Sequence, residues 1–181
     1  MRLRRLRTSD LTPAEIVEIR GLLDAAFWDD EDERFTEADW DHSIGGIHFV
    51  LDDDGTIVSH ASVVERELRI AGRPFRTGYV EAVATTPDRQ REGFGTTVMR
   101  DATAYILETF ELGGLGTGEQ GFYERLGWTT WLGPSSVRTH DGGERRTPDE
   151  DGYIMVLLTP ASVTVDLAAG ISCEWRPGDV W

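Results

Sequence analysis

The chain has 181 residues and a formal net charge of −15, and 39% of its residues are hydrophobic. This length suits one domain, and the composition is that of a folded globular protein. A field this negative repels nucleic acid and anionic membranes and attracts cationic small molecules, so we expect neither nucleic acid nor a membrane as a partner. The basic start, MRLRRLR, is not followed by a long apolar stretch and is not typical of a secretory signal.

The single cysteine, Cys173, excludes an internal disulfide and suits the reducing cytoplasm, where we expect the protein to act. The four histidines and this cysteine show no zinc-ligand spacing, so we expect no metal. No apolar run approaches the ~20 residues that a membrane-spanning helix needs.

The first third of the chain predicts a strand and two helices. Residues 1–7 are typical of a short strand with arginines on its solvated face. Thr12, followed by proline, is a typical helix start, and the apolar residues after it have helical spacing. Residues 28–35, WDDEDERF, are predicted to be an acidic loop. Thr36 precedes Asp39 by three residues, which indicates the capped start of a second helix.

From residue 46 the pattern changes to the alternation of strands. Residues 46–86 indicate three antiparallel strands joined by tight turns. The remaining predicted elements are a helix over 94–110, a strand over 111–117, a short helix ending at Gly127, a strand near 129–137, a polar turn over 147–152 and a strand over 153–160. The tail after Ser162 is weakly patterned. This order predicts an α+β fold, a mixed and mostly antiparallel sheet flanked by helices, in a single domain over residues 1–181.

Residues 87–99 read PDRQREGFGTTVM, with two glycines between a predicted strand and a predicted helix. A glycine turn at a helix start exposes unpaired backbone N–H groups, which bind phosphate. Arg89, Arg91 and Arg100 add local positive charge in an acidic chain. The P-loop and the GxGxxG dinucleotide patterns are both absent from the sequence. We therefore expect a phosphate-bearing ligand of another kind.

The hexapeptide QREGFG (90–95) resembles motif A of the GNAT acyl-CoA N-acetyltransferases, and FYERLGW (122–128) resembles their motif B. Five further segments resemble the aminoglycoside 2′-N-acetyltransferases within that superfamily: TEADWDHSIGGIHFV (36–50), GYVEAVAT (78–85), GPSSV (133–137), RTPDEDG (146–152) and CEWRPGDVW (173–181). The chain is identified on these segments as a member of that family, which implies a GNAT acyl-CoA N-acyltransferase fold.

The resemblance implies an enzyme that transfers acetyl from acetyl-CoA to the 2′-amine of aminoglycosides such as gentamicin and tobramycin. Transfer would occur by direct attack in a ternary complex and would give antibiotic resistance. The family also implies a cytoplasmic homodimer. No metal enters this chemistry.

The resemblance places coenzyme A on the backbone of one strand and of the glycine turn. The implied cofactor-binding residues are Val83, Ala84, Thr85, Gln90, Arg91, Glu92, Gly93, Phe94 and Gly95. The Val83 N–H would donate to the thioester carbonyl, and the turn would hold the pyrophosphate. Glu92 is an unusual side chain beside phosphate, so we expect it to point to solvent.

Three residues are predicted to be catalytic. Glu81 matches the family's VE dipeptide and would accept the proton of the substrate ammonium; the alternative is a strand glutamate paired with an arginine. Tyr123 matches the motif B tyrosine that protonates the CoA thiolate; the alternative is a core aromatic. We expect the Phe122 ring to lie in the core and the Tyr123 ring outside it. The third is Trp181, through its terminal carboxylate.

A polycationic acceptor needs an anionic pocket. The implied substrate-binding residues are Asp39, Glu81, Ala82, Gly116, Asp149, Glu150, Asp151, Asp179 and Trp181. The alternatives are solvated surface acids and a frayed terminus. Two features differ from the family pattern: Arg34 stands where an acid is expected, and residues 116–121 form a shorter segment with glycines in place of hydroxyl residues.

Two other functions stay open at this point. A GNAT enzyme could acetylate another amine, such as a polyamine, an amino sugar or a peptide N-terminus. A coenzyme A sensor without turnover would bind CoA equally well after Glu81→Gln or Tyr123→Phe.

Overall fold

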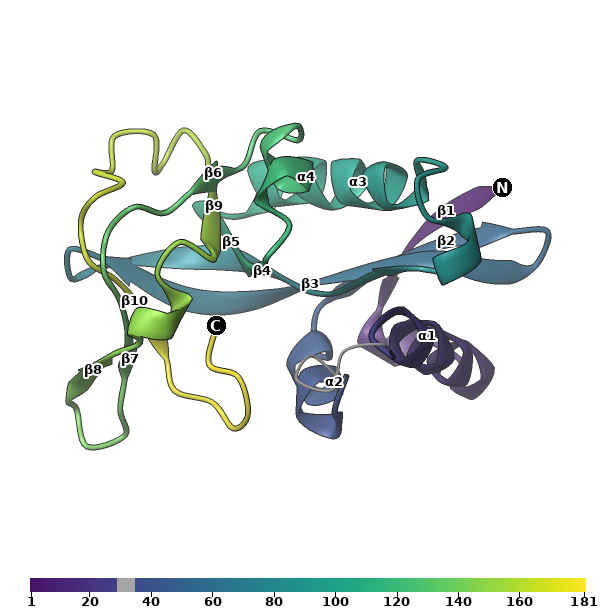
Figure 1. Cartoon of the computed structure of the whole chain (residues 1–181), viewed down its shortest axis with the longest axis horizontal. Coiled ribbons are helices and arrows are strands. Elements are labelled where there is room, and N and C mark those ends of the chain that lie inside the picture. The colour runs from purple at the N-terminus through teal and green to yellow at the C-terminus, as the bar shows by residue number, and fades with distance from the viewer. Residues whose placement is uncertain (29–34) are drawn as a thin grey trace. The chain divides into compact units, whose positions relative to one another are not determined.

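The computed structural model describes residues 1–28 and 35–181 (Figure 1). The departure at Arg34 and most of the predicted acidic loop lie outside the described residues. The chain divides into two compact units: unit 1 comprises Met1–Val64 and Val80–Ala102, and unit 2 comprises Glu65–Tyr79 and Thr103–Trp181. Three elements pass from one unit into the other, namely β3 (Thr56–Ile70), β4 (Arg73–Thr85) and α3 (Phe94–Thr109). The single domain over residues 1–181 stays a prediction.

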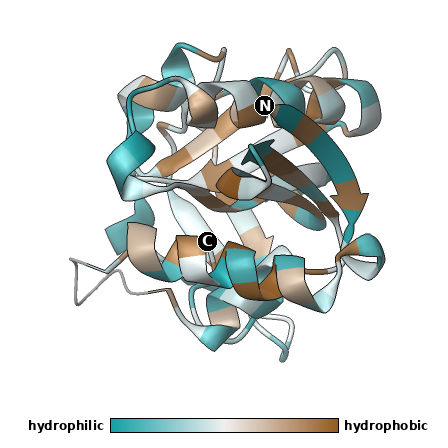
Figure 2. Cartoon of the chain, turned by 90° about the vertical axis from the view of Figure 1, so that its right-hand side faces the viewer, coloured by the Kyte–Doolittle hydropathy of each residue, from teal (hydrophilic) through white to brown (hydrophobic). Residues whose placement is uncertain are grey.

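Unit 1 is a small sheet covered by helices. Its antiparallel strand order is β1-β2-β3, with β1 at Arg2–Arg7 and β2 at Ile47–Asp53. The helices α1 (Pro13–Ala26) and α2 (Glu37–Ser43) lie over one face of these strands (Figure 1). A core of apolar side chains joins them: Leu11, Ile19, Leu22, Leu23, Trp40, Val50, Ile57 and Ala84. Figure 2 shows hydrophobic and hydrophilic residues alternating along the helices, as expected where one helix face packs on a sheet.

Both helices of unit 1 begin as the sequence predicts. Thr12 accepts a hydrogen bond from the Glu15 backbone N–H, and the Glu15 carboxylate accepts one from the Thr12 backbone in return. Thr36 and Asp39 form the same reciprocal arrangement at the start of α2. These capping boxes satisfy N–H groups that a helix start otherwise leaves unpaired, and each contributes about 1 kcal/mol to helix stability.

Unit 2 contains a mixed sheet of strand order β6-β9-β5-β4-β3-β10-β7-β8. The strands not yet bounded are β5 (Leu112–Gly116), β6 (Thr129–Thr130), β7 (Ser135–Arg138), β8 (Glu144–Arg146), β9 (Ile154–Leu158) and β10 (Ile171–Glu174). The β4–β5 and β7–β10 pairs are parallel, and the pairs formed by β9, β8 and β3 with their neighbours are antiparallel. This mixed sheet confirms the predicted α+β class.

The predicted boundaries differ from the structure mainly in unit 2. The predicted strand 129–137 is interrupted between Thr130 and Ser135, where the Leu132 and Gly133 N–H groups both donate to Leu167 O over 3.0 Å. Gly133 leaves no room for a side chain here, since an added Cβ would lie 1.9 Å from Ala169 O. The short helix α4 (Gln120–Glu124) ends before Gly127, the predicted last residue. The strands β8 and β10 were not predicted from the sequence pattern. Among the described residues, short 3₁₀ helices lie at Thr8–Asp10 (η1), Pro87–Arg89 (η2) and Pro148–Glu150 (η3).

Candidate active site

The glycine turn in unit 1 presents the start of α3. Two residues, Arg91 (φ +67) and Gly93 (φ +90), adopt left-handed backbone conformations and turn the chain into the helix. The Thr97 N–H donates to Gly93 O over 3.0 Å, which is the first intrahelical bond. Helix geometry leaves the three N–H groups before Thr97 without an intrahelical partner. Residues 91–93 are exposed, so this turn can meet an anion at the surface.

The side chains around this turn are less positive than the sequence suggests. Arg89 donates to Glu92 over 2.9 Å and to Asp53 over 3.3 Å, and its guanidinium lies 4.6 Å from the centre of the Phe94 ring. Its charge is therefore already neutralised by two carboxylates. The Glu92 side chain is exposed as expected, but it points to Arg89 rather than to solvent alone. Positive charge for a bound phosphate is left to Arg91 and Arg100, which are exposed.

The end of β4 carries an unusual backbone conformation. Ala82 has φ +51, which is uncommon for a residue with a Cβ and interrupts the extended strand. We call this interruption the Ala82 kink. Beyond it, the Thr86 N–H donates to Val58 O of β3, so Thr86 faces β3. Because successive residues of a strand point their backbone groups to opposite sides, the Val83 and Thr85 amides point away from β3. Glu81, just before the kink, is half-buried.

In unit 2 the C-terminal residue is held in place. Trp181 is 4% exposed, and its indole N–H donates to Thr147 Oγ1 over 2.9 Å. Its backbone N–H donates to Asp179 Oδ1 over 3.0 Å, and Trp181 O accepts from Arg176 over 3.0 Å. A Cβ added at Gly116 would lie 3.7 Å from the terminal carboxyl carbon. The structure thus brings Gly116, Asp179 and Trp181 together, and the tail is not a frayed end.

A buried arginine that sequence analysis missed supports this tail. The Arg66 side chain is 4% exposed and donates to Glu174 Oε1 over 2.8 Å and to Val180 O over 2.8 Å. Its guanidinium also stacks 4.6 Å from the centre of the Tyr79 ring. A signal was present in the sequence: in ERELRI, Arg66 shares the face of Leu68 and Ile70, which is the buried face of β3.

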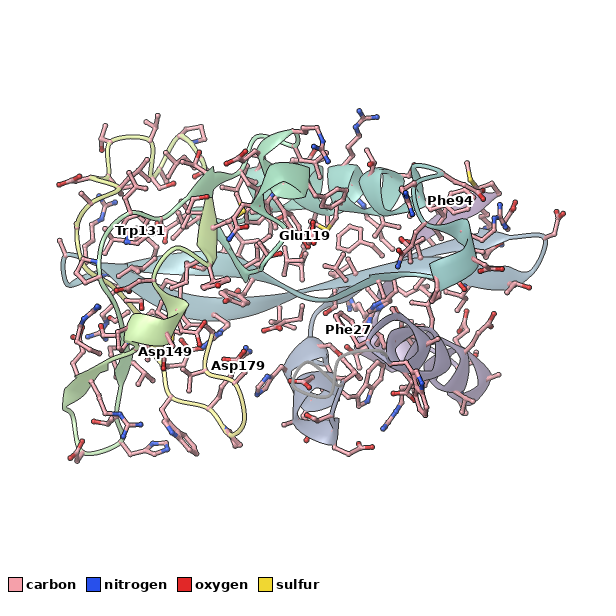
Figure 3. All side chains as sticks on the ribbon, in the orientation of Figure 1. Phe27, Phe94, Glu119, Trp131, Asp149 and Asp179 are labelled. Carbon is pink, nitrogen blue, oxygen red and sulfur yellow. The ribbon has the colours of Figure 1, made fainter. Side chains whose placement is uncertain are left out.

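The four acids of unit 2 that are predicted to bind the acceptor differ in their environment. Burial, together with the charges of Asp179 and Asp149, raises the pKa of Glu150. Asp149 and Asp179 lie in the same region of unit 2, one on η3 and one on the tail (Figure 3). Asp151 instead accepts from the Ser135 N–H over 2.9 Å and from Arg146 over 2.6 Å, and the Ser135 bond lowers its pKa. Both carboxylate oxygens of Asp151 are therefore occupied, one by Ser135 of β7 and the other by Arg146 of β8.

Tyr123 lies inside unit 2 rather than outside it. It is 7% exposed, and its ring meets Phe122 edge-on at 4.9 Å and Trp128 at 6.3 Å. The expected arrangement was wrong, because Tyr123 is buried and Phe122 is only half-buried. Burial and the charge of Glu119 raise the Tyr123 pKa, so the phenol is protonated at neutral pH and can donate a proton or a hydrogen bond.

Asp39 lies in unit 1, half-buried at the start of α2. Its Oδ2 accepts from the backbone N–H and from the hydroxyl of Thr36, both over 2.7 Å. One carboxylate oxygen is therefore committed to the helix cap, which leaves Oδ1 for any substrate amine.

The predicted residues thus fall into two groups. Unit 1 holds Asp39, Glu81, Ala82 and all the cofactor-binding residues: Val83, Ala84, Thr85, Gln90, Arg91, Glu92, Gly93, Phe94 and Gly95. Unit 2 holds Gly116, Tyr123, Asp149, Glu150, Asp151, Asp179 and Trp181. Within residues 1–28 and 35–181, no group of three or more histidine, cysteine or acidic side chains could hold a metal ion. Over the same residues, no helix combines the length and apolarity needed to cross a membrane.

Comparison with known proteins defines the class first. The family model described as acetyltransferase (GNAT) domain matches residues 7–131. A GNAT-family N-acetyltransferase of Escherichia coli, solved with CoA, superposes with a TM-score of 0.66 at 14% identity over 98% of this chain and 93% of that one. A GNAT acetyltransferase of Brucella melitensis, solved with acetyl-CoA, gives 0.56 at 18% identity over 84% and 94%. At these identities the likeness shows the fold alone.

A curated relative narrows the class. The aminoglycoside 2′-N-acetyltransferase of Mycolicibacterium fortuitum is 39% identical over 183 aligned residues, which cover 98% of this chain and 91% of the relative. The chain belongs to the aminoglycoside 2′-N-acetyltransferase family of the GNAT superfamily.

Some structures of the same fold are much larger than this chain. The chain spans only 33% of one of them, a probable N-acyltransferase of Enterococcus faecalis.

Proposed function

We propose that the protein transfers the acetyl group of acetyl-CoA to the 2′-amine of aminoglycoside antibiotics. The observation that carries the proposal is the 39% identity to an aminoglycoside 2′-N-acetyltransferase over nearly the whole chain. The anchored tail and the acids beside it are what recognition of a polycation requires.

Coenzyme A would bind to unit 1 through main-chain groups. The free N–H groups at the start of α3 suit its pyrophosphate, with Arg91 and Arg100 supplying charge. The Val83 N–H, which points away from β3, would donate to the thioester carbonyl. This donor polarises the carbonyl and stabilises the oxyanion that forms when the amine attacks.

The chemistry needs two proton transfers. Glu81 takes the proton of the substrate ammonium, directly or through a water molecule, so that a neutral amine can attack the thioester carbon. The new C–N bond forms and the C–S bond breaks, and the departing thiolate needs a proton. Tyr123, kept protonated by burial, is suited to donate it. No covalent enzyme intermediate is required.

The acceptor would bind where unit 2 is anionic. Asp149, Glu150 and Asp179 lie close enough for two of them to raise the pKa of the third, so cationic groups there relieve mutual repulsion. The terminal carboxylate of Trp181 adds a fixed charge beside Gly116. We further propose that the protein acts in the cytoplasm as a homodimer and confers aminoglycoside resistance.

The test is thiol release from acetyl-CoA with tobramycin, which has a 2′-amine, and with kanamycin A, which has a 2′-hydroxyl. Turnover with tobramycin alone is the expected result. Turnover with both drugs would place the acetylated amine elsewhere on the molecule. Turnover with neither drug, but with a polyamine, would favour an acetyltransferase for another amine. CoA binding without any turnover, unaffected by Glu81→Gln, would favour a sensor.

A further inference from the structure

Two buried histidines of unit 1 contact each other through their ring nitrogens, and the proposed chemistry uses neither. His48 on β2 and His60 on β3 are both 0% exposed. Their ring nitrogens, His48 Nδ1 and His60 Nε2, are 2.9 Å apart. At the outer end His48 Nε2 lies 2.9 Å from Thr8 Oγ1. At the inner end His60 Nδ1 lies 2.8 Å from the carbonyl oxygen of Ala82, the residue of the kink.

The hydrogen-bond partners at the two ends determine which ring nitrogen of each histidine carries the proton. A carbonyl oxygen can only accept, so His60 carries its proton on Nδ1. Burial lowers the pKa of His60 to about 3 and of His48 to about 4, so both rings are neutral and each has one N–H. His60 Nε2 therefore accepts from His48 Nδ1–H, and His48 Nε2 accepts from the Thr8 hydroxyl. Thr8 Oγ1 in turn accepts from the Gly45 N–H over 2.8 Å.

Neighbouring side chains of β3 contact the same stretch of β4. Ser59 Oγ donates to Ala84 O over 2.9 Å, and Ser62 Oγ lies 3.3 Å from Glu81 O. Carbonyls between adjacent strands normally accept from backbone N–H groups. Around the left-handed Ala82, side chains of β3 also bond to these carbonyls. The His60 bond is the shortest of the three and ends on the kinked residue itself.

We propose that His60 is a positioning residue that holds the Ala82 kink in the conformation in which Val83 N–H and Glu81 serve acetyl transfer. This inference rests on the proposed function, because the orientation of Val83 N–H and Glu81 matters only if these groups take part in acetyl transfer. His48 acts behind His60: by donating to Nε2 it selects the tautomer that places the donor on Nδ1. Glu81 precedes Ala82 and Val83 follows it, so a rotation at Ala82 moves both groups.

The proton arrangement can be tested without any activity. In a long-range ¹H–¹⁵N spectrum, both rings are expected to show the neutral Nδ1–H tautomer across about pH 6 to 8. The spectrum of Thr8→Val is expected to leave His60 unchanged, because Thr8 Oγ1 bonds to His48 and to the Gly45 N–H and not to His60. An Nε2–H tautomer or a protonated ring for His60 would overturn the inference.

The functional role is tested with His60→Asn and His60→Ala. The asparagine Nδ2 occupies nearly the place of His60 Nδ1 and keeps the donor to Ala82 O, whereas alanine removes it. We expect kcat of the asparagine variant within about threefold of the wild type and kcat of the alanine variant reduced about 30-fold, with the KM for tobramycin little changed. Equal kcat in the wild type and the alanine variant would overturn the inference.

A stability control separates positioning from folding. Leu112→Ala removes a fully buried side chain of β5 that is not part of the core cluster against which Ala82 packs. Urea unfolding is expected to show that it destabilises the protein while kcat stays near that of the wild type. If Leu112→Ala lowers kcat as much as His60→Ala does, the histidine has only a structural role.

Equilibrium binding keeps this inference distinct from the proposed function. The ratio of the Kd for CoA to the Kd for acetyl-CoA reports the hydrogen bond to the thioester carbonyl and needs no acceptor. His60→Ala is expected to lower this ratio about fivefold relative to the wild type, and His60→Asn to preserve it. If the wild type acetylates no amine, the proposed function fails, and this ratio and the tautomers still decide the inference. An unchanged ratio in His60→Ala overturns it.

Discussion

The proposed cofactor region of unit 1 and the proposed acceptor region of unit 2 are built in opposite ways. The first presents main-chain N–H groups from one continuous stretch, β4 through α3, and its nearby Arg89 is already neutralised. The second presents side chains and a terminal carboxylate from segments far apart in the sequence, held by Arg66 and Arg176. Binding of a ligand through main-chain N–H groups tolerates changes of side chain. An anionic surface assembled from distant segments depends on each side chain that holds those segments in place.

The largest expected effect tests the chemistry that both regions serve. Glu81→Gln removes the proposed base and should lower kcat about 10²- to 10³-fold with little change in the Kd for CoA. Stopped-flow or steady-state thiol release measures it. Glu65→Gln on β3, an exposed carboxylate, is the matched control and should leave kcat unchanged. A kcat of Glu81→Gln within threefold of the wild type would contradict the assignment.

Arg66→Leu should break the acceptor region specifically. The change leaves Val180 O without its charged donor and Glu174 with only the longer ion pair to Arg138, and should cost about 3 kcal/mol of unfolding free energy. Because the tail loses its anchor, the KM for tobramycin should rise about tenfold or more while the Kd for CoA stays the same.

The control for this variant is Arg69→Leu, on the same strand but with an exposed side chain paired only to Glu67. It should change stability by less than about 1 kcal/mol. Urea denaturation and separate titrations of each substrate measure these effects. Equal losses of CoA and tobramycin binding in Arg66→Leu would contradict the separation of the two regions.

Gly93→Ala should weaken the cofactor region by a smaller amount. Gly93 has φ +90 with open space around it, so the methyl group meets no atom and the cost is backbone strain of about 1 kcal/mol. We expect a several-fold higher Kd for CoA by calorimetry, and no change in the KM for tobramycin. Gly55→Ala, at φ +86 in the β2–β3 turn, carries similar strain and should leave CoA binding intact.

The smallest expected effect is a pH dependence of acceptor binding. The pKa of Glu150 lies above its usual 4.5, so Glu150 loses its charge sooner than an ordinary glutamate as the pH falls. The KM for tobramycin should therefore rise as the pH falls, and this rise should begin at a higher pH than an ordinary glutamate would produce. In Glu150→Gln this rise should flatten and the KM at neutral pH should be higher. Parallel pH profiles of the two proteins would show that another group is responsible.

The elements were largely predictable because their signals are local. Thr12 and Thr36 cap helices where the pattern places them, and the alternation of residues 46–86 gives three antiparallel strands. The wrong predictions of secondary structure lie where contacts between residues far apart in the sequence determine the strands. The Leu132 and Gly133 N–H groups bond to Leu167 O instead of continuing a strand, and β10 forms by pairing with strands far away in sequence.

In the candidate site, too, the features set by local sequence were predictable and those set by long-range contacts were not. The glycine turn could be predicted because the residues that shape it are adjacent in sequence. The orientation of Tyr123 could not, since the choice between burying it or Phe122 depends on Trp128 and the packing of unit 2. The engagement of Asp151 with Ser135 and Arg146 was likewise invisible to any local pattern.

The sequence by itself determined the α+β class, the family and the position of the glycine turn before α3, because short-range patterns and motifs carry that information. Only the tertiary structure decided which charges are free and which are committed. Arg89 and Asp151 are paired, Arg66 is buried under the tail, and His60 supports the Ala82 kink. The physical reason is that pairing and desolvation depend on distance in space, and folding joins residues that the sequence keeps far apart.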